Sequence, residues 1–172
     1  IGIATAATIN NFGVINFTDD AGINNNSGAI LTMINSGTLT KSGGVGTSNV
    51  AGTSAGSFFT NSGVVNVNSG TIVIRAIGTS TGAYNILSGD TLQFEVGTQT
   101  FSSSSSFTGA GRINLNSLTG TFDAGCSFSA GISVTQSGGT INWNNSPTLN
   151  TINLPGGTMQ GSGTVTISNI FN

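Results

Sequence analysis

Apolar and polar residues alternate with a period of two along most of the chain. The segment 64–68 reads Val-Val-Asn-Val-Asn, and the segments 91–96, 113–116, 140–144 and 164–167 show the same alternation. Such alternation over four to six residues is typical of half-buried β-strands. Thr, Ile, Val and Phe, which favour strands, are common, whereas the best helix formers are scarce. The pattern therefore predicts an all-β protein.

Small residues separate these segments at recurring intervals. The steps contain Gly37, Gly63, Gly89, Gly111, Gly120, Gly139 and Gly157. From Gly37 to Gly111 the steps recur after 22 to 26 residues, and from Gly120 to Gly157 after 18 or 19. Glycine tolerates positive φ angles, and Asn does so better than most residues, so each step can form a tight corner. A unit of this length, with two or three short strands, is typical of a repeat array.

The corners favour parallel stacking over hairpins. An antiparallel barrel or sandwich needs hairpin dipeptides, yet the chain has 21 Asn and 27 Gly without one Asn-Gly or Asp-Gly. A parallel solenoid stacks like residues, and columns of Asn, Thr or Ser can bond to one another. We therefore expect one continuous parallel β-helix over residues 1–172, right-handed by the crossover rule, with about eight coils of roughly 18–26 residues. Its coils should be less regular over 1–58 than over 59–172.

Four segments resemble repeats of large bacterial surface and secreted β-solenoid proteins, such as autotransporter passenger domains and filamentous adhesins. They are residues 69–72, 82–94, 107–113 and 157–165. The resemblance covers most of 59–170 and implies a β-solenoid on the cell surface or outside the cell. It implies no particular activity, because such repeats serve as stalks, adhesive rods and enzyme scaffolds.

Composition excludes several classes of function. Three basic residues against five acidic ones, a formal charge of −2, cannot neutralise a nucleic-acid backbone. With no His and one Cys the chain cannot form the usual zinc site or an imidazole triad. No apolar run is long enough to span a membrane. We expect no cofactor, and the 36% of hydrophobic residues argue against disorder.

The acidic residues are the only candidates for catalysis, because paired carboxylates can hydrolyse glycosidic bonds. They are Asp19, Asp20, Asp90, Glu95 and Asp123. Adjacent Asp19 and Asp20 are expected to cap a turn rather than to hold calcium, and Asp90 follows a corner glycine. Glu95 should face solvent and pair with Arg75 or Arg112 on a neighbouring coil. We therefore predict no catalytic, cofactor-binding or metal site, and no enzymatic activity.

Aromatic residues and the single thiol are expected in the interior. Trp143 has the parity of Ile141 and is predicted to pack in the core rather than to stack on a sugar, whereas Tyr84 fits either role. Cys126 is expected to be a buried small side chain rather than an intermolecular bridge. The run Ser102–Ser106 is either a flexible loop or a corner that continues the coil. The expected interior cluster consists of Phe94, Phe101, Phe107, Phe122 and Phe128.

Thr-x-Thr pairs occur at 38/40, 98/100, 119/121 and 164/166. A flat ladder of such pairs can bind ice in some solenoids. Here the four pairs do not recur at a fixed period, so we interpret the outward Thr residues as ordinary strand surface.

Neither end of the sequence resembles a polar or helical cap, which solenoids use to protect their open coils. We expect either a piece of a longer solenoid or a subunit that associates head to tail with its own copies. The function favoured is a structural rod of the cell exterior, in an extracellular filament or a long surface stalk. The alternative is a carbohydrate-binding adhesin or passenger domain with glycan partners. A polysaccharide-degrading enzyme or an ice-binding protein is less favoured.

Overall fold

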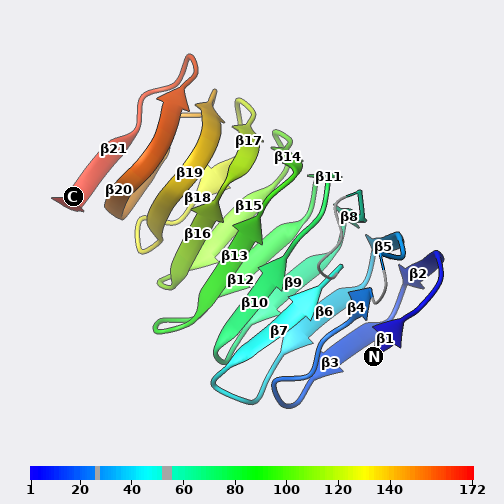
Figure 1. Cartoon of the computed structure of the whole chain (residues 1–172). Helices are drawn as coiled ribbons and strands as arrows, with labels where there is room; N and C mark the ends of the chain where they lie inside the picture. The colour runs from blue at the N-terminus through cyan, green and yellow to red at the C-terminus, as the bar shows by residue number, and fades with distance from the viewer. Residues whose placement is uncertain (26–27, 52–55) are drawn as a thin grey trace.

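A computed structural model describes residues 1–25, 28–51 and 56–172. Its strands lie side by side along one axis from the N-terminus to the C-terminus (Figure 1). Every strand pair is parallel, and the described residues contain no helix. The chain is therefore a β-solenoid of about eight turns, which confirms the predicted fold class.

Three rows of parallel strands form the walls, and we name them faces A, B and C. Face A contains β1 (Gly2–Ile3), β4 (Asn24–Asn25), β7 (Thr47–Val50), β10 (Thr71–Ile74), β13 (Thr91–Glu95), β16 (Arg112–Asn116), the first parts of β19 (Ser133–Trp143) and β20 (Thr148–Gln160), and β21 (Thr166–Phe171). Face B contains β2 (Ala7–Asn11), β5 (Leu31–Asn35), β8 (Phe58–Asn61), β11 (Gly78–Ser80), β14 (Thr98–Phe101), β17 (Leu118–Phe122) and the second parts of β19 and β20. Face C contains β3 (Val14–Phe17), β6 (Thr38–Lys41), β9 (Val64–Val67), β12 (Ala83–Ile86), β15 (Ser106–Gly109) and β18 (Ser127–Phe128).

The register between strands fixes the length of each coil. Paired residues lie 18 positions apart where Ser133 meets Thr151 and 26 positions apart where Thr32 meets Phe58. Differences in coil length are taken up in the connections between faces, so the strands themselves remain aligned. The observed coil lengths match those expected from the spacing of the glycines.

The glycines of the Asn-Ser-Gly steps are required by close stacking of the corners. A Cβ on Gly63 would collide with the carbonyl oxygen of Gly37 in the preceding coil, and a Cβ on Gly37 would collide with that of Gly13. Neither Gly37 nor Gly63 has a positive φ angle. The corners were predicted correctly, but at these two positions the reason is the short distance between coils rather than a left-handed backbone.

Inward-facing side chains form a dry core along the axis. Ile, Val, Leu and Phe residues of all three faces are buried in one cluster. Tyr84 and Trp143 belong to it, so the question left open for Tyr84 is settled in favour of the core. The rings of Phe101, Phe122 and Trp143 stack with centroid separations of 4.8 and 4.6 Å. The predicted cluster forms as well, with contacts among Phe94, Phe101, Phe107, Phe122 and Phe128.

A ladder of buried asparagines occupies the corner between faces B and C in the first three coils. The Asn11 Nδ2 donates to Asn35 Oδ1 at 2.7 Å, and the Asn35 Nδ2 donates to Asn61 Oδ1 at 2.8 Å. Each amide also donates to the carbonyl of the residue that begins the next strand of face C, at Thr38, Val64 and Ala83. Burying an amide without hydrogen-bond partners costs free energy. The ladder supplies these partners, so the Asn side chains can be buried.

Candidate functional site: outer faces and open ends

A connected polar network covers the middle of face A. Arg75 forms an ion pair with Glu95 through its Nε, and its Nη1 donates to Asn49 Oδ1 at 2.9 Å. The other carboxylate oxygen of Glu95 accepts hydrogen bonds from Gln93 and Asn116. The sequence left Arg75 and Arg112 as alternative partners of Glu95, and the structure selects Arg75. Since surface ion pairs contribute about 0–1 kcal/mol, the network orders the surface more than it stabilises the fold.

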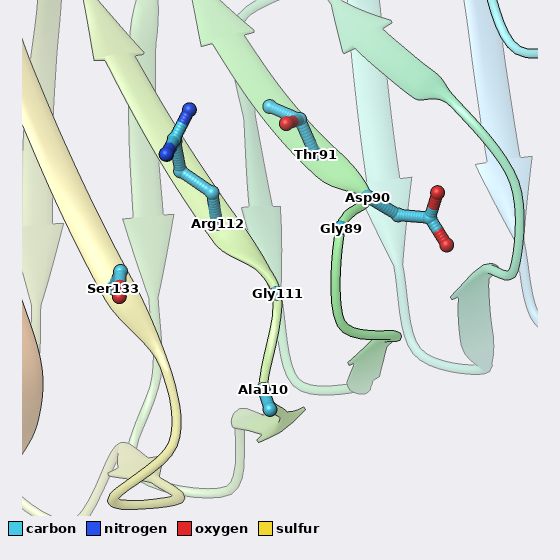
Figure 2. Close-up of a pocket in the computed structure, with 7 residues that line it drawn as sticks. All are labelled: Gly89, Asp90, Thr91, Ala110, Gly111, Arg112 and Ser133. Carbon is cyan, nitrogen blue, oxygen red and sulfur yellow. The ribbon is translucent and has the colours of Figure 1, made fainter.

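Arg112 has no ion pair among the described residues and stands beside two polar hollows. The smaller, of about 110 Å³, lies between the turns at Gly89 and Ala110 (Figure 2). In Figure 2 the side chains of Arg112 and Asp90 point away from each other. The larger hollow, of about 400 Å³, continues along face A past Asn114, Ser133 and neighbouring hydroxyl and amide side chains. Asn114 Oδ1 is buried there without a hydrogen-bond partner in the described part of the chain.

The remaining carboxylates are dispersed over the coils. Asp19 Oδ1 accepts the N–H of Ala21 at 2.7 Å, which confirms the predicted turn cap. The backbone N–H of Asp90 donates to the carbonyl of Leu87. Asp90 therefore lies in a turn, as predicted. Within residues 1–25, 28–51 and 56–172, no group of three or more His, Cys, Asp or Glu side chains could hold a metal ion.

Lys41 is the charged residue whose role the sequence analysis missed. It occupies an inward position of face C between Phe17 and Val67, and its side chain is 0% exposed. Its Nζ reaches the corner, where it donates to Asp20 Oδ1 at 2.9 Å and to the carbonyls of Asp19 and Gly43. The hydrogen bond from Lys41 and the N–H of Gly46 hold the pKa of Asp20 below its ordinary value, although partial desolvation opposes the shift. Lys41 lies two positions after the buried Leu39, so the alternation of the sequence could have indicated that its side chain points inward.

The thiol, the phenol and the serine run all belong to the interior or to the coil. Cys126 is buried, as predicted, and burial raises the pKa of its thiol to about 12. Burial also raises the pKa of Tyr84. Ser105 is buried and donates to the carbonyl of Ser80 at 2.7 Å. The run 102–106 is therefore a corner that continues the coil rather than a flexible loop.

Outward Thr residues line up on face B, although the Thr-x-Thr pairs do not recur at a fixed period in the sequence. Thr98 pairs with Thr119, and Thr100 pairs with Thr121. The first column continues to Thr140 and Thr158 in the next two coils. The pairs at 38/40 and 164/166 lie elsewhere on the molecule. The connections between faces absorb the variation in coil length, which conceals this alignment in the sequence.

Both terminal coils present apolar core residues and strands that are paired on one side. At the N-terminal end an apolar hollow of about 290 Å³ is lined by Ile1, Ile9, Ile15, Phe17 and neighbouring residues. The strands β1, β2 and β3 pair only with β4, β5 and β6 among the described residues. At the other end β21 pairs only with β20 in the described structure, and Ile170 and Phe171 are exposed.

No family model, curated protein or solved structure matches this chain. Among the described residues there is also no helix of the length and apolarity needed to cross a membrane.

Proposed function

We propose that this protein is a non-enzymatic structural rod of the cell exterior, which stacks end to end into an extracellular filament or forms part of a long surface stalk. The observation that carries the proposal is the parallel ladder: among the described residues, its first and last strands pair on one side alone. Strands at the edge of a sheet are templates for pairing with another chain. A head-to-tail contact of this kind does not close on itself, so it lengthens into a filament.

Apolar surface at the two ends supports stacking. Ile1, Ile9 and Ile15 line the apolar hollow at the first coil, and Ile170 and Phe171 are exposed at the last. Burial of apolar area contributes about 25 cal/mol per Å², so contact between the two ends would be favourable. The inner core would then continue from one molecule into the next, as it does from coil to coil within the chain.

The distribution of charge predicts how such a filament responds to solution conditions. Residues 124–172 contain no Asp, Glu, Lys or Arg. Screening by salt acts only on charges, so an interface formed by this end should be nearly insensitive to ionic strength. The resemblance to bacterial surface solenoids supports the extracellular location.

Negative-stain microscopy of the purified chain tests this proposal. We expect rods of uniform width that are much longer than the roughly 40 Å of eight coils at strand spacing. Ile15→Lys places a charge in the apolar hollow of the first coil and should shorten the rods. Val45→Lys is the matched control, because Val45 is 92% exposed in the connection between β6 and β7. Short particles of the unmodified chain at every concentration, or fibres that dissolve after a modest pH change, would contradict the filament.

The hollow beside Arg112 favours a second candidate function, a carbohydrate-binding adhesin. Its lining of Arg112, Asn114, Ser133 and further hydroxyl and amide groups offers donors and acceptors for sugar hydroxyls, and the guanidinium could bind a sugar carboxylate. A glycan array that includes acidic polysaccharides would test this function. Arg112→Gln should abolish binding to acidic glycans, whereas Arg75→Gln, outside the hollow, should leave it unchanged.

A further inference from the structure

Face B presents a two-column array of outward positions across eight successive coils. Within these sixteen positions the register places ten Thr residues and no charged residue. The other six positions hold Asn10, Ile34, Phe58, Ile77, Asn142 and Gln160. The Thr residues are Thr8, Thr32, Thr60, Thr79, Thr98, Thr100, Thr119, Thr121, Thr140 and Thr158. Thr is thus concentrated on this face, which distinguishes it from face A with its network of Arg75, Glu95 and Arg112.

The hydroxyls of this array are free to bond outward. On face C the outward Asn66 donates to Thr40, and Thr108 donates to Asn85, so neighbouring coils satisfy one another. On face B the side chains of Thr79, Thr98, Thr100 and Thr119 form no such bond within the described residues. Elsewhere in the described part of the array, Thr121 accepts a hydrogen bond from Asn142 at 3.4 Å, and Gln160 donates to Asn142 at 2.6 Å. The array therefore presents methyl groups and unpaired hydroxyls together.

Backbone geometry holds these groups in a regular lattice. Parallel strands lie about 4.8 Å apart, and alternate residues along a strand lie about 6.6 Å apart. The β-branched Thr side chain has a restricted χ1 angle, and the ladder beneath it is continuous through β14, β17 and β19. A ligand would therefore meet groups whose conformational entropy has already been lost on folding.

We propose that the Thr array of face B binds the surface of ice. A rigid two-dimensional array is best matched by a ligand that is itself periodic and uncharged, and that both donates and accepts hydrogen bonds. Ice is such a ligand, because its water molecules form an uncharged, periodic lattice in which each molecule donates and accepts hydrogen bonds. Hydroxyls hold ordered water at little entropic cost, and methyl groups between them exclude water that does not fit the lattice. This site uses the side of the solenoid, so it is independent of the proposed contacts between ends.

The test measures inhibition of ice recrystallisation and thermal hysteresis with the whole chain. We expect activity for the unmodified protein. Thr119→Lys should reduce that activity on the order of tenfold or more, because a decrease of about 1.4 kcal/mol in binding free energy lowers the affinity tenfold. Thr119 is exposed near the middle of the array. Thr47→Lys is the matched control, because Thr47 is an exposed strand residue of face A.

Each outcome decides the proposal once circular dichroism has confirmed the β-fold of all three proteins. The proposal is supported if Thr119→Lys loses the activity on ice and Thr47→Lys retains it. Absence of activity in the folded, unmodified chain overturns it, and so does an equal loss in the two variants. Retention of the unmodified chain on crystalline chitin or cellulose without any effect on ice also overturns it, because the array would then recognise a glycan. The length of the rods in microscopy is measured separately, so failure here leaves the structural function intact.

Discussion

The corner between faces B and C is filled in two different ways along the molecule. In the first three coils it holds Asn11, Asn35 and Asn61, which bond to one another. In later coils the same register column holds aromatic rings, at Phe101, Phe122 and Trp143. Ser80 lies between the two regions and pairs with both Asn61 and Phe101. One backbone path thus accepts either a polar ladder or an aromatic stack.

The two fillings stabilise the solenoid by different means. Aromatic rings exclude water and add offset or edge contacts, each worth about 0.5–1.5 kcal/mol beyond area burial. A hydrogen-bonded amide contributes about 1 kcal/mol net but requires its partner at the right height and angle. We infer that the aromatic region is the more stable one and that the Asn region fixes the register more strictly. Three substitutions test this contrast, from the largest expected effect to the smallest.

Phe122→Ala should cause the largest loss of stability. Phe122 contacts the rings of Phe101, Phe107, Phe128 and Trp143, so its removal leaves a cavity in the centre of the stack. We expect a decrease of about 3–5 kcal/mol in the free energy of unfolding, measured by urea denaturation. Phe12→Ala is the control and should change it by less than about 0.5 kcal/mol, because Phe12 is 79% exposed. Similar losses in the two variants would refute the importance of the stack.

Asn35→Ala should have an intermediate effect. It removes one of the two acceptors of the Asn11 amide, which keeps its hydrogen bond to Thr38, and it removes the Asn35 amide that donates to Asn61 Oδ1 and to the carbonyl of Val64. Orphaned buried groups cost about 1–3 kcal/mol, so we expect a loss in that range. Asn66→Ala removes an amide of the same type from the outer surface of face C, where water can replace it, and should cost about 0.5 kcal/mol. Equal losses would mean that the buried ladder contributes nothing specific.

Asp20→Asn should have the smallest effect at neutral pH, because Asp20 is about half exposed and Lys41 keeps its hydrogen bonds to the carbonyls of Asp19 and Gly43. The pH dependence of stability is the property that should change. Because the pKa of Asp20 is lowered in the folded chain, its ionised form stabilises the fold above its ordinary pKa, and that contribution is lost as the pH falls. The melting temperature of the unmodified protein should therefore fall more steeply between about pH 5 and pH 2 than that of Asp20→Asn. Asp90→Asn, which changes a carboxylate outside this cluster, should retain the steeper fall. Parallel pH profiles for the Asp20→Asn and unmodified proteins would contradict the assignment.

Sequence patterns were sufficient to predict the fold, because the alternation of apolar and polar residues within each strand shows which side chains point inward. The alternation around Val65 and Leu92 and the corner glycines predicted strands, parallel stacking and coil length. The burial of Trp143 and the ion pair of Glu95 were predicted on the same basis. Contacts between coils depend instead on register, which the connections of variable length conceal.

Three features could not be read reliably for this reason. Asn35 and Lys41 have inward parity, but amides and ammonium groups are ordinarily exposed, so parity alone did not place them in the core. Their partners, Asn11, Asn61 and Asp20, become apparent only when successive coils are aligned. The alignment of Thr98 with Thr119 on face B is concealed in the same way.

In the first four coils the corner between faces B and C restricts where the sequence can change in length. In the first four coils two residues separate the strands at this corner, as between Asn11 and Val14 or between Ser80 and Ala83. Because a Cβ at Gly37 or Gly63 already meets the coil beneath, extra residues there have no room. The corner between faces C and A differs in length from coil to coil and leaves Val45 open to solvent. Grafted peptides or epitope tags should therefore be accommodated at the corner between faces C and A, spaced along the rod at multiples of the coil repeat.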